Sequence, residues 1–263
     1  MNLQEMLDQA ASGTAHVEGG WGQGRATYGG LVGALAYSAL RAQLTADPRP
    51  PLRSLTVNFV APVGPGQAEV EATILRAGSS ATQGLVQLRQ DDKVAAAVLA
   101  AFGAPRTSAI RVEPTAVTMP DLPDPESIEP FPYIPGATPD FFQHVELRLA
   151  DGSAPFAGAD TSHMSGWMRF RQAPPTFDER HFIALADAWP PAVIQMLPTP
   201  APGSSLTWTL ELLGDVTAEP DTHWAYAVHT DQAGDGYAHT DARIWHPDGR
   251  LVAISRQTVS VFG

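Results

Sequence analysis

The chain has 263 residues, of which 44% are hydrophobic and 17% charged, a balance typical of a soluble globular protein. Its formal net charge of -12 argues against nucleic acid and anionic membranes as partners. The absence of cysteine excludes disulfides, thiolate catalysis and zinc–cysteine sites. No signal-peptide pattern opens the chain and no apolar run is long enough to span a membrane, so we expect a cytoplasmic protein.

Residues 27–44, TYGGLVGALAYSALRAQL, form the first long apolar segment. Small or apolar residues lie on nearly every side of it, which predicts a helix that other structure surrounds. Gly29 and Gly30 near its start allow another backbone to come close, and their amides have no partners within the helix. The pairs Asp47-Pro48 and Pro50-Pro51 end the helix.

Four strand-like runs follow this helix. In residues 67–76, apolar positions alternate with charged or polar ones, which is the pattern of a strand with one solvated face. Asp91-Asp92 predicts a tight hairpin between the last two runs. We therefore predict one buried helix and a four-stranded antiparallel meander, with strands at residues 52–62, 67–76, 81–90 and 93–103.

Residues 104–139 hold nine prolines and show no periodicity. This composition predicts an extended connector between two structural units. We accordingly divide the chain into an N-terminal repeat at residues 1–103, this linker, and a C-terminal repeat at residues 140–263.

The C-terminal repeat opens with predicted strands at residues 141–149 and 165–172, and a helix is predicted over residues 176–191, TFDERHFIALADAWPP. Thr176 and Glu179 have the spacing of a capping box. Asp187 interrupts the apolar face of this helix, where an ionised carboxylate is costly unless it is compensated. Two interpretations stay open: Asp187 is a functional group, or it lies on a solvated edge or bonds a neighbouring backbone amide.

Four more strand-like runs follow the second helix and repeat the first half of the chain. Ser205-Leu206-Thr207 repeats Ser54-Leu55-Thr56 at the start of the first strand, and both last strands end in Phe-Gly. We interpret this as an internal duplication. Because each copy leaves a sheet edge unpaired, we expect the two copies to join into one continuous sheet.

The two copies differ at polar positions. Counted back from the shared Phe-Gly, Gln257 corresponds to Ala97. The matching Ser-Leu-Thr segments make Ser205 the counterpart of Ser54. Asp187 falls opposite residues 33–36 of the first helix, a region of small residues. Only the second copy carries the polar set, so we expect a single composite site in the chain.

These segments resemble the TesB-like acyl-CoA thioesterases. The resemblance is carried by TYGGLVGALAYSAL and ALADAWPPAVIQMLP in the helices, by SLTVNFVAPV and SLTWTLELL at the strand starts, and by the terminal RLVAISRQTVSVFG. It covers roughly residues 21–103 and 141–263. It implies an α+β double hotdog fold, in which two helix-plus-antiparallel-meander repeats form one curved sheet around two central helices.

The resemblance also implies the catalytic residues. Asp187 matches the family's catalytic aspartate, Ser205 matches its hydroxyl residue at a strand start, and Gln257 matches its glutamine in the last strand. Family members commonly continue that strand start with Asp-His, whereas this chain has Thr207-Trp208. Thr207 is therefore an alternative hydroxyl, and the choice of substrate is left open.

Thioester hydrolysis needs a water aimed at the carbonyl carbon, a proton acceptor and donors for the oxyanion. Asp187 is the predicted base or water-orienting group, and Ser205 and Gln257 would hold the same water. Amides near Gly29 and Gly30, at a positive helix end, would polarise the carbonyl. The side chains predicted to line an acyl tunnel, or else to be plain core, are Leu31, Leu35, Trp189 and Trp208. The candidate contacts of the CoA phosphates are Arg25, Arg53 and Arg76.

Two other functions compete with acyl-CoA hydrolysis. A non-catalytic acyl-CoA or acyl-chain binding protein could use the same fold, and a hotdog hydratase or dehydratase would need a catalytic histidine such as His181. The histidines show no metal-ligand spacing on one helix, so we predict neither a metal site nor a cofactor. The predicted partner is an acyl-CoA molecule, and assembly into a homodimer stays open.

Overall fold

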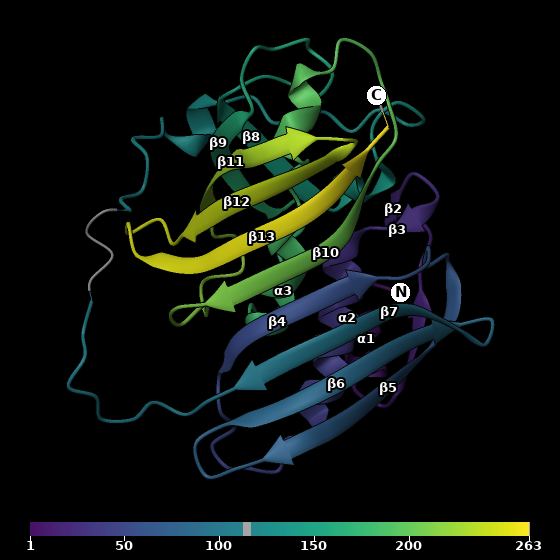
Figure 1. Cartoon of the computed structure of the whole chain (residues 1–263), viewed down its shortest axis with the longest axis vertical. Coiled ribbons are helices and arrows are strands. Elements are labelled where there is room, and N and C mark those ends of the chain that lie inside the picture. The colour runs from purple at the N-terminus through teal and green to yellow at the C-terminus, as the bar shows by residue number, and fades with distance from the viewer. Residues whose placement is uncertain (113–116, 263) are drawn as a thin grey trace.

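The computed structural model describes residues 1–112 and 117–262. Within them, one antiparallel sheet of 11 strands curves around two neighbouring helices, α2 (Gly29–Ala42) and α3 (Glu179–Ala186) (Figure 1). The predicted α+β double hotdog fold is therefore confirmed.

The sheet has the strand order β1-β5-β6-β7-β4-β10-β13-β12-β11-β9-β8, and β2 and β3 form a separate small ribbon. The strands are β1 (Thr14–Val17), β2 (Gly22–Gln23), β3 (Ala26–Thr27), β4 (Leu52–Phe59), β5 (Gly66–Ala77), β6 (Thr82–Gln90), β7 (Lys93–Phe102), β8 (Val145–Asp151), β9 (His163–Phe170), β10 (Gly203–Leu212), β11 (Trp224–Gly234), β12 (Tyr237–Trp245) and β13 (Leu251–Val261). The remaining helical segments are α1 (Leu3–Ala10) and the short 3-10 helices η1 (Pro125–Ser127), η2 (Asp140–Gln143) and η3 (Ala192–Met196).

The two repeats meet at the centre of the sheet, where β4 pairs with β10. Thr56 lies opposite Thr209 there, and their hydroxyl oxygens are 3.3 Å apart. Outward from this junction the strands follow in matching order, β7, β6 and β5 in one half and β13, β12 and β11 in the other. The copies therefore share one sheet, as their unpaired edges predict.

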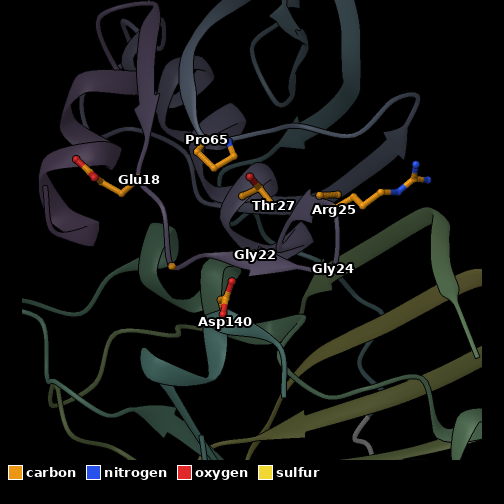
Figure 2. Close-up of a pocket in the computed structure, with 9 residues that line it drawn as sticks. Glu18, Gly22, Gly24, Arg25, Thr27, Pro65 and Asp140 are labelled. Atoms are coloured by element: carbon orange, nitrogen blue, oxygen red, sulfur yellow. The ribbon is translucent and has the colours of Figure 1, made fainter. Parts of the chain in front are cut away.

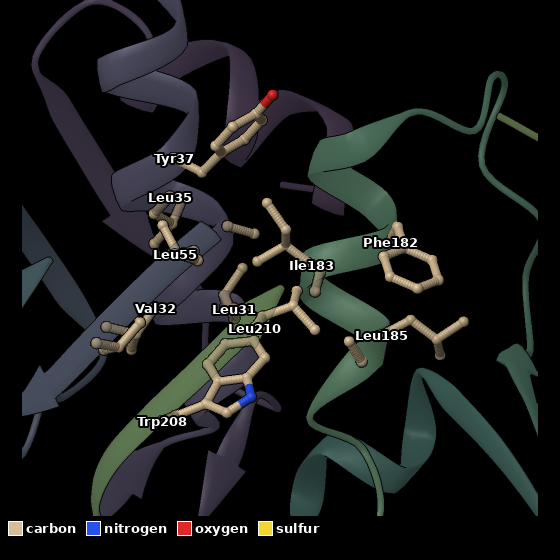
Figure 3. Close-up of a cluster of buried hydrophobic side chains, with 14 of the residues drawn as sticks. Leu31, Val32, Leu35, Tyr37, Leu55, Phe182, Ile183, Leu185, Trp208 and Leu210 are labelled. Atoms are coloured by element: carbon tan, nitrogen blue, oxygen red, sulfur yellow. The ribbon is translucent and has the colours of Figure 1, made fainter. Parts of the chain in front are cut away.

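Helix α2 is enclosed, as its apolar sequence on all sides predicts. Of its 14 residues, 11 are buried. Two glycines let neighbouring elements pack directly on its backbone: a Cβ at Gly30 would lie 2.6 Å from the Ala184 carbonyl oxygen, and one at Gly33 would lie 2.8 Å from the Trp208 ring. Figure 3 shows Leu31 of α2 facing α3, with the Trp208 ring of β10 beside it.

Helix α3 is shorter than the helix predicted over residues 176–191. It begins at Glu179, because Asp178 rather than Thr176 caps it. The Asp178 N–H donates to His181 Nδ1 at 3.3 Å, which completes the capping box. The predicted capping box joined Thr176 to Glu179, whereas the observed box joins Asp178 to His181.

Several strands differ from the prediction, among them β4, which ends at Phe59 instead of residue 62. The predicted strand at residues 141–149 begins only at Val145, because Phe141 and Phe142 lie in η2 and are buried. Strand β9 begins at His163, two residues before the predicted start. Strand β1 was not predicted, because four residues are too short a run to show a clear alternation.

The second half of the predicted linker packs on the outer face of the C-terminal sheet instead of extending away from it. Trp167 Nε1 donates to the Pro123 carbonyl at 2.9 Å, and Arg148 donates to the carbonyls of Pro125 and Ile128 at 2.7 and 2.8 Å. Leu122 joins the small apolar cluster around Trp167. Residues 113–116 of the linker lie outside the described residues.

Candidate active site

Asp187 is the C-cap of α3, with φ -97° and ψ 7°, and does not lie within a continuing helix as predicted. The helix ends at Ala186 because Pro190 and Pro191 lack the N–H groups that the next turn would need. This early end turns the Asp187 side chain toward the first turn of α2. Its carboxylate therefore lies at the junction of the two helices.

A chain of two hydrogen bonds joins Asp187 to the sheet. Gln257 Nε2 on β13 donates to Asp187 Oδ1 at 2.7 Å, and Ser205 Oγ on β10 donates to Gln257 Oε1 at 2.6 Å. The three side chains named by the resemblance thus come from three separate elements and meet in one place.

Asp187 has an unusual electrostatic environment. Burial raises the pKa of its carboxyl from 3.8 to about 7, although the Gln257 amide and the Gly30 backbone N–H, which both donate to the carboxylate, lower it. The side chain is nevertheless only partly buried, so water can reach it. A carboxylate with a pKa near neutral pH accepts protons far more readily than an ordinary aspartate.

Two tyrosines lie near this carboxylate. Burial, and then the charge of Asp187, raise the pKa of both Tyr28 and Tyr226 well above the usual value, so both phenols stay protonated. The Tyr226 ring on β11 stacks on Trp189 at a centroid distance of 5.4 Å and an angle of 5°. Sequence analysis did not single out either tyrosine, since neither is close to Asp187 along the chain.

A β-bulge decides which of the two candidate hydroxyls meets Gln257. Leu206 is the extra residue of the bulge, since Ser205 pairs with Val259 while Thr207 pairs with Thr258. Trp208 is fully buried and faces the helices. Because neighbouring residues of a strand face opposite sides, Thr207 lies on the outer face, while Ser205 faces inward with Val259.

The four side chains considered for the acyl tunnel are all buried in the hydrophobic core. Trp208 Nε1 donates to Ser255 Oγ at 2.9 Å, and its ring packs against Gly33. Leu31 and Leu35 are both 0% exposed. Trp189 is the member of the set closest to Asp187 in the chain, and its ring stacks on Tyr226.

The sheet register corrects two of the predicted correspondences between the repeats. Arg53 is the extra residue of a matching bulge in β4, where Leu52 pairs with Phe102. Matching the bulges makes Leu52 the counterpart of Ser205 and Ala100 the counterpart of Gln257, in place of Ser54 and Ala97. Counting from Phe-Gly failed because Phe102 belongs to β7, whereas Phe262 lies beyond the end of β13.

The helices correct a third correspondence. Tyr37 lies eight residues after the first residue of α2, and Asp187 lies eight residues after the first residue of α3. Tyr37 is therefore the counterpart of Asp187, in place of the predicted residues 33–36. Its hydroxyl bonds the Glu179 carboxylate, which also accepts the Leu52 N–H at 3.2 Å. The first repeat thus places tyrosine, leucine and alanine where the second has aspartate, serine and glutamine.

The candidate phosphate-binding arginines are not gathered in one place. Arg25 lines a small cavity of about 100 Å³ at the β2–β3 ribbon, and Figure 2 shows its side chain extending away from Asp140 on the opposite wall. Arg53 Nε instead donates to the Gly103 carbonyl at 2.9 Å, and Arg76 lies on β5.

Comparison with protein families identifies the family of the chain. A model of the acyl-CoA thioesterase C-terminal domain matches residues 125–261, and one of the N-terminal domain matches residues 17–103. The chain belongs to the acyl-CoA thioesterase family. The resemblance to TesB-like thioesterases is thereby confirmed, and the C-terminal domain of the family begins inside the predicted linker. A comparison with curated proteins finds no match.

Solved structures share the whole fold. A conserved protein of unknown function with a hot dog fold from Alicyclobacillus acidocaldarius is 25% identical, with a TM-score of 0.84 and 98% of each chain covered. A putative thioesterase II from Thermobifida fusca is 22% identical, with a TM-score of 0.79, covering 95% of this chain and 92% of the other. The acyl-CoA thioesterase II TesB2 from Mycobacterium marinum is 21% identical, with a TM-score of 0.74, covering 99% and 98%. The last two show likeness of fold alone.

Two features are absent from the residues that the structure describes. None of the helices there is both long and apolar enough to cross a membrane. In the same part of the chain, no group of three or more His, Asp or Glu residues is arranged to hold a metal ion.

Proposed function

We propose that the protein hydrolyses the thioester of an acyl-CoA to a free acid and CoA, with Asp187 activating the water. The observation that carries this proposal is the bonded series of Ser205, Gln257 and Asp187 at the first turn of α2. The raised pKa of Asp187 suits a general base at neutral pH, and membership of the family indicates thioester chemistry.

The three side chains have separate roles in this proposal. Gln257 donates one Nε2 hydrogen to Asp187 and accepts from Ser205, which leaves its second Nε2 hydrogen for a water molecule. Asp187 removes a proton from that water while the water oxygen bonds to the carbonyl carbon. The carbon–sulfur bond then breaks, and the proton passes from Asp187 to the CoA sulfur, which restores the carboxylate.

The first turn of α2 is assigned to the oxyanion. The Gly30 N–H already bonds Asp187, so the Gly29 N–H and the positive end of the helix are the groups we assign to the carbonyl oxygen. A Cβ at Gly29 would lie 2.7 Å from Asp187 Oδ2 and 2.9 Å from the Phe59 ring. Glycine at this position therefore lets the Asp187 carboxylate and the Phe59 ring pack directly on the backbone at the start of α2.

We place the acyl chain beside Trp189 and Tyr226. Trp189 follows Asp187 closely in the chain, and the Asp187 charge raises the pKa of Tyr226. The two rings stack on each other. Leu31, Leu35 and Trp208 are fully buried, so a chain that reaches them must displace packed side chains. The length of chain that fits is therefore set by how far these three residues can move.

The hydratase alternative is disfavoured by the position of its histidine. His181 does pair with an acid, since its Nδ1 lies 3.0 Å from Asp178 Oδ1. It is, however, 0% exposed and occupies the capping box at the opposite end of α3 from Asp187. The acyl-CoA binding protein remains the second candidate, because the Thr207-Trp208 departure puts an indole ring in the core beside Gln257.

The experiment is thiol release from acyl-CoAs of graded chain length by the parent protein and by Asp187→Asn. Asparagine keeps the shape and one oxygen that can accept from Gln257, but it cannot take the proton. We expect kcat to fall about 10²- to 10⁴-fold with a much smaller change in acyl-CoA affinity. Activity within a few-fold of the parent in a folded Asp187→Asn protein would refute the assigned role. Binding without hydrolysis by the parent would favour the binding protein.

A further inference from the structure

We infer that Tyr28 is a positioning residue for this reaction: its hydroxyl holds the last turn of α3 and so fixes Asp187 beside Gln257. The inference rests on the proposed function. Tyr28 is the N-cap residue of α2 and is 0% exposed. Its hydroxyl donates to the Ala184 carbonyl at 2.8 Å and thus ties the start of one central helix to the end of the other.

The Ala184 carbonyl needs this donor because α3 ends early. In a continuing helix it would accept the N–H of Ala188. That N–H instead bonds the Leu185 carbonyl at 2.9 Å, in the tighter spacing of a helix end. Without Tyr28 the Ala184 carbonyl would be buried with no donor from the next turn, which is costly. The turn that carries Asp187 is therefore stabilised by Tyr28 in place of further helix.

Gly30 gives the Tyr28 side chain its path to α3. A Cβ at Gly30 would lie 2.5 Å from the Tyr28 hydroxyl oxygen and 2.6 Å from the Ala184 carbonyl oxygen. The ring is fixed on its other side by Phe141, which stacks on it at 4.2 Å and 10°. The Tyr28 N–H bonds the Trp21 carbonyl at 2.8 Å. Tyr28 is thus held by its backbone, its ring and its hydroxyl.

The electrostatic environment keeps Tyr28 a donor. Burial, and then the Asp187 carboxylate, raise its pKa well above the ordinary value, while the backbone N–H of Asp187 lowers it. The phenol is therefore protonated at neutral pH and can donate to the Ala184 carbonyl. The same contacts place the Tyr28 hydroxyl beside the backbone of Asp187, whereas Gln257 meets the side chain.

Tyr37 provides a matched control. It lies on the same helix, is also 0% exposed, and its hydroxyl also bonds α3, at the Glu179 carboxylate. Tyr37→Phe therefore removes a buried hydroxyl that joins the same two helices, but at the end of α3 that is remote from Asp187. Any loss that comes only from weaker helix packing should be shared by Tyr28→Phe and Tyr37→Phe.

The test compares the parent, Tyr28→Phe, Tyr37→Phe and Asp187→Asn in thiol-release kinetics across pH. For Tyr28→Phe we expect kcat to fall about 10- to 100-fold, because the base is displaced from its working geometry, with KM nearly unchanged. The acidic limb of its pH–rate profile should move to lower pH, because a looser turn exposes Asp187 to more water and so lowers its pKa. Tyr37→Phe should keep the parent's kcat and acid limb within about twofold and a few tenths of a pH unit.

A second readout does not depend on turnover. Carboxyl-labelled aspartate followed by NMR gives the pKa of Asp187, assigned by the signal missing in Asp187→Asn. We expect that pKa to fall in Tyr28→Phe and to stay in place in Tyr37→Phe. Parent-like kcat and Asp187 pKa in Tyr28→Phe would overturn the inference, as would equal changes in both tyrosine variants. An active Asp187→Asn would instead refute the role assigned to Asp187, and a parent that binds acyl-CoA without hydrolysing it would refute the proposed function, whatever Tyr28→Phe shows.

Discussion

Asp187 packs between the first turn of α2, β13 and its own helix end, and its burial there raises its pKa from 3.8 to about 7 although water can still reach it. The same residue therefore links activity to pH and stability to pH. A base must be deprotonated to act, so kcat/KM should rise with pH through about 7 and level off above it. Thiol-release rates between pH 5 and 9 measure this rise in kcat/KM. A rise centred near pH 4 would contradict the assignment of Asp187 as the base.

The stability of the protein should change in the opposite direction. A carboxyl whose folded pKa exceeds its unfolded pKa binds more protons when folded, so stability falls as pH rises from about 4 to about 7. The shift corresponds to at most about 4 kcal/mol. Asp187→Asn lacks this penalty, so at pH 8 it should be more stable than the parent in urea unfolding, and the gain should shrink toward pH 4. An equal difference at both pH values would mean that burial of the charge is not the cause.

At the scale of elements, the bulge in β10 separates the two hydroxyls that sequence analysis could not choose between. Ser205 bonds Gln257, whereas Thr207 faces outward next to Asn58. Ser205→Ala should lower kcat roughly 3- to 10-fold, which is the value of one modest hydrogen bond. Thr207→Val keeps the shape and should stay within about twofold of the parent. The reverse order of effects in the same assay would show that Thr207 is the functional hydroxyl.

The strands of the first meander could be predicted well because alternation and turn residues are local signals. The prediction at residues 93–103 differs from β7 by one residue at its end. The bulge at Leu206 and the true counterpart of Gln257 could not be predicted, since both depend on which residues pair across strands. The predicted start of α3 was wrong, because Thr176 and Asp178 are both favourable N-cap residues and only the tertiary structure determines which of them caps the helix.

At the scale of the whole molecule, the duplication supplies two helix junctions in one sheet, and the two carry different polar groups. At the other junction, the Glu179 carboxylate accepts hydrogen bonds from the Tyr37 hydroxyl and the Leu52 N–H. Arg41 Nε lies 3.9 Å from the same glutamate. The residues that stand in the first repeat for Asp187, Ser205 and Gln257 are Tyr37, Leu52 and Ala100, so the expectation of a single site of this kind stays a prediction.

The linker is the remaining part of the molecule whose role the composition did not predict. Its proline content indicated a connector, yet residues 117–128 contribute apolar side chains to a cluster with Trp167 and Trp245. Arg148 is the main polar attachment. Its guanidinium bonds two linker carbonyls and the Glu146 carboxylate at 2.7 Å, and its side chain is 8% exposed. The linker therefore covers part of the outer sheet face.

This attachment should be measurable as stability. Arg148→Met keeps an apolar side chain of similar length but leaves two carbonyls and part of the Glu146 charge without a partner, so we expect a loss of about 2–4 kcal/mol in urea unfolding. Glu146 keeps Arg169 at 3.0 Å, which limits the loss. The control is Arg250→Met, whose partner Asp248 is exposed, and it should cost under about 1 kcal/mol. Limited proteolysis should cut Arg148→Met faster between residues 117 and 128, because the linker detaches from the sheet. Equal stability of the two variants with unchanged cleavage would show that the linker is held by its apolar cluster alone.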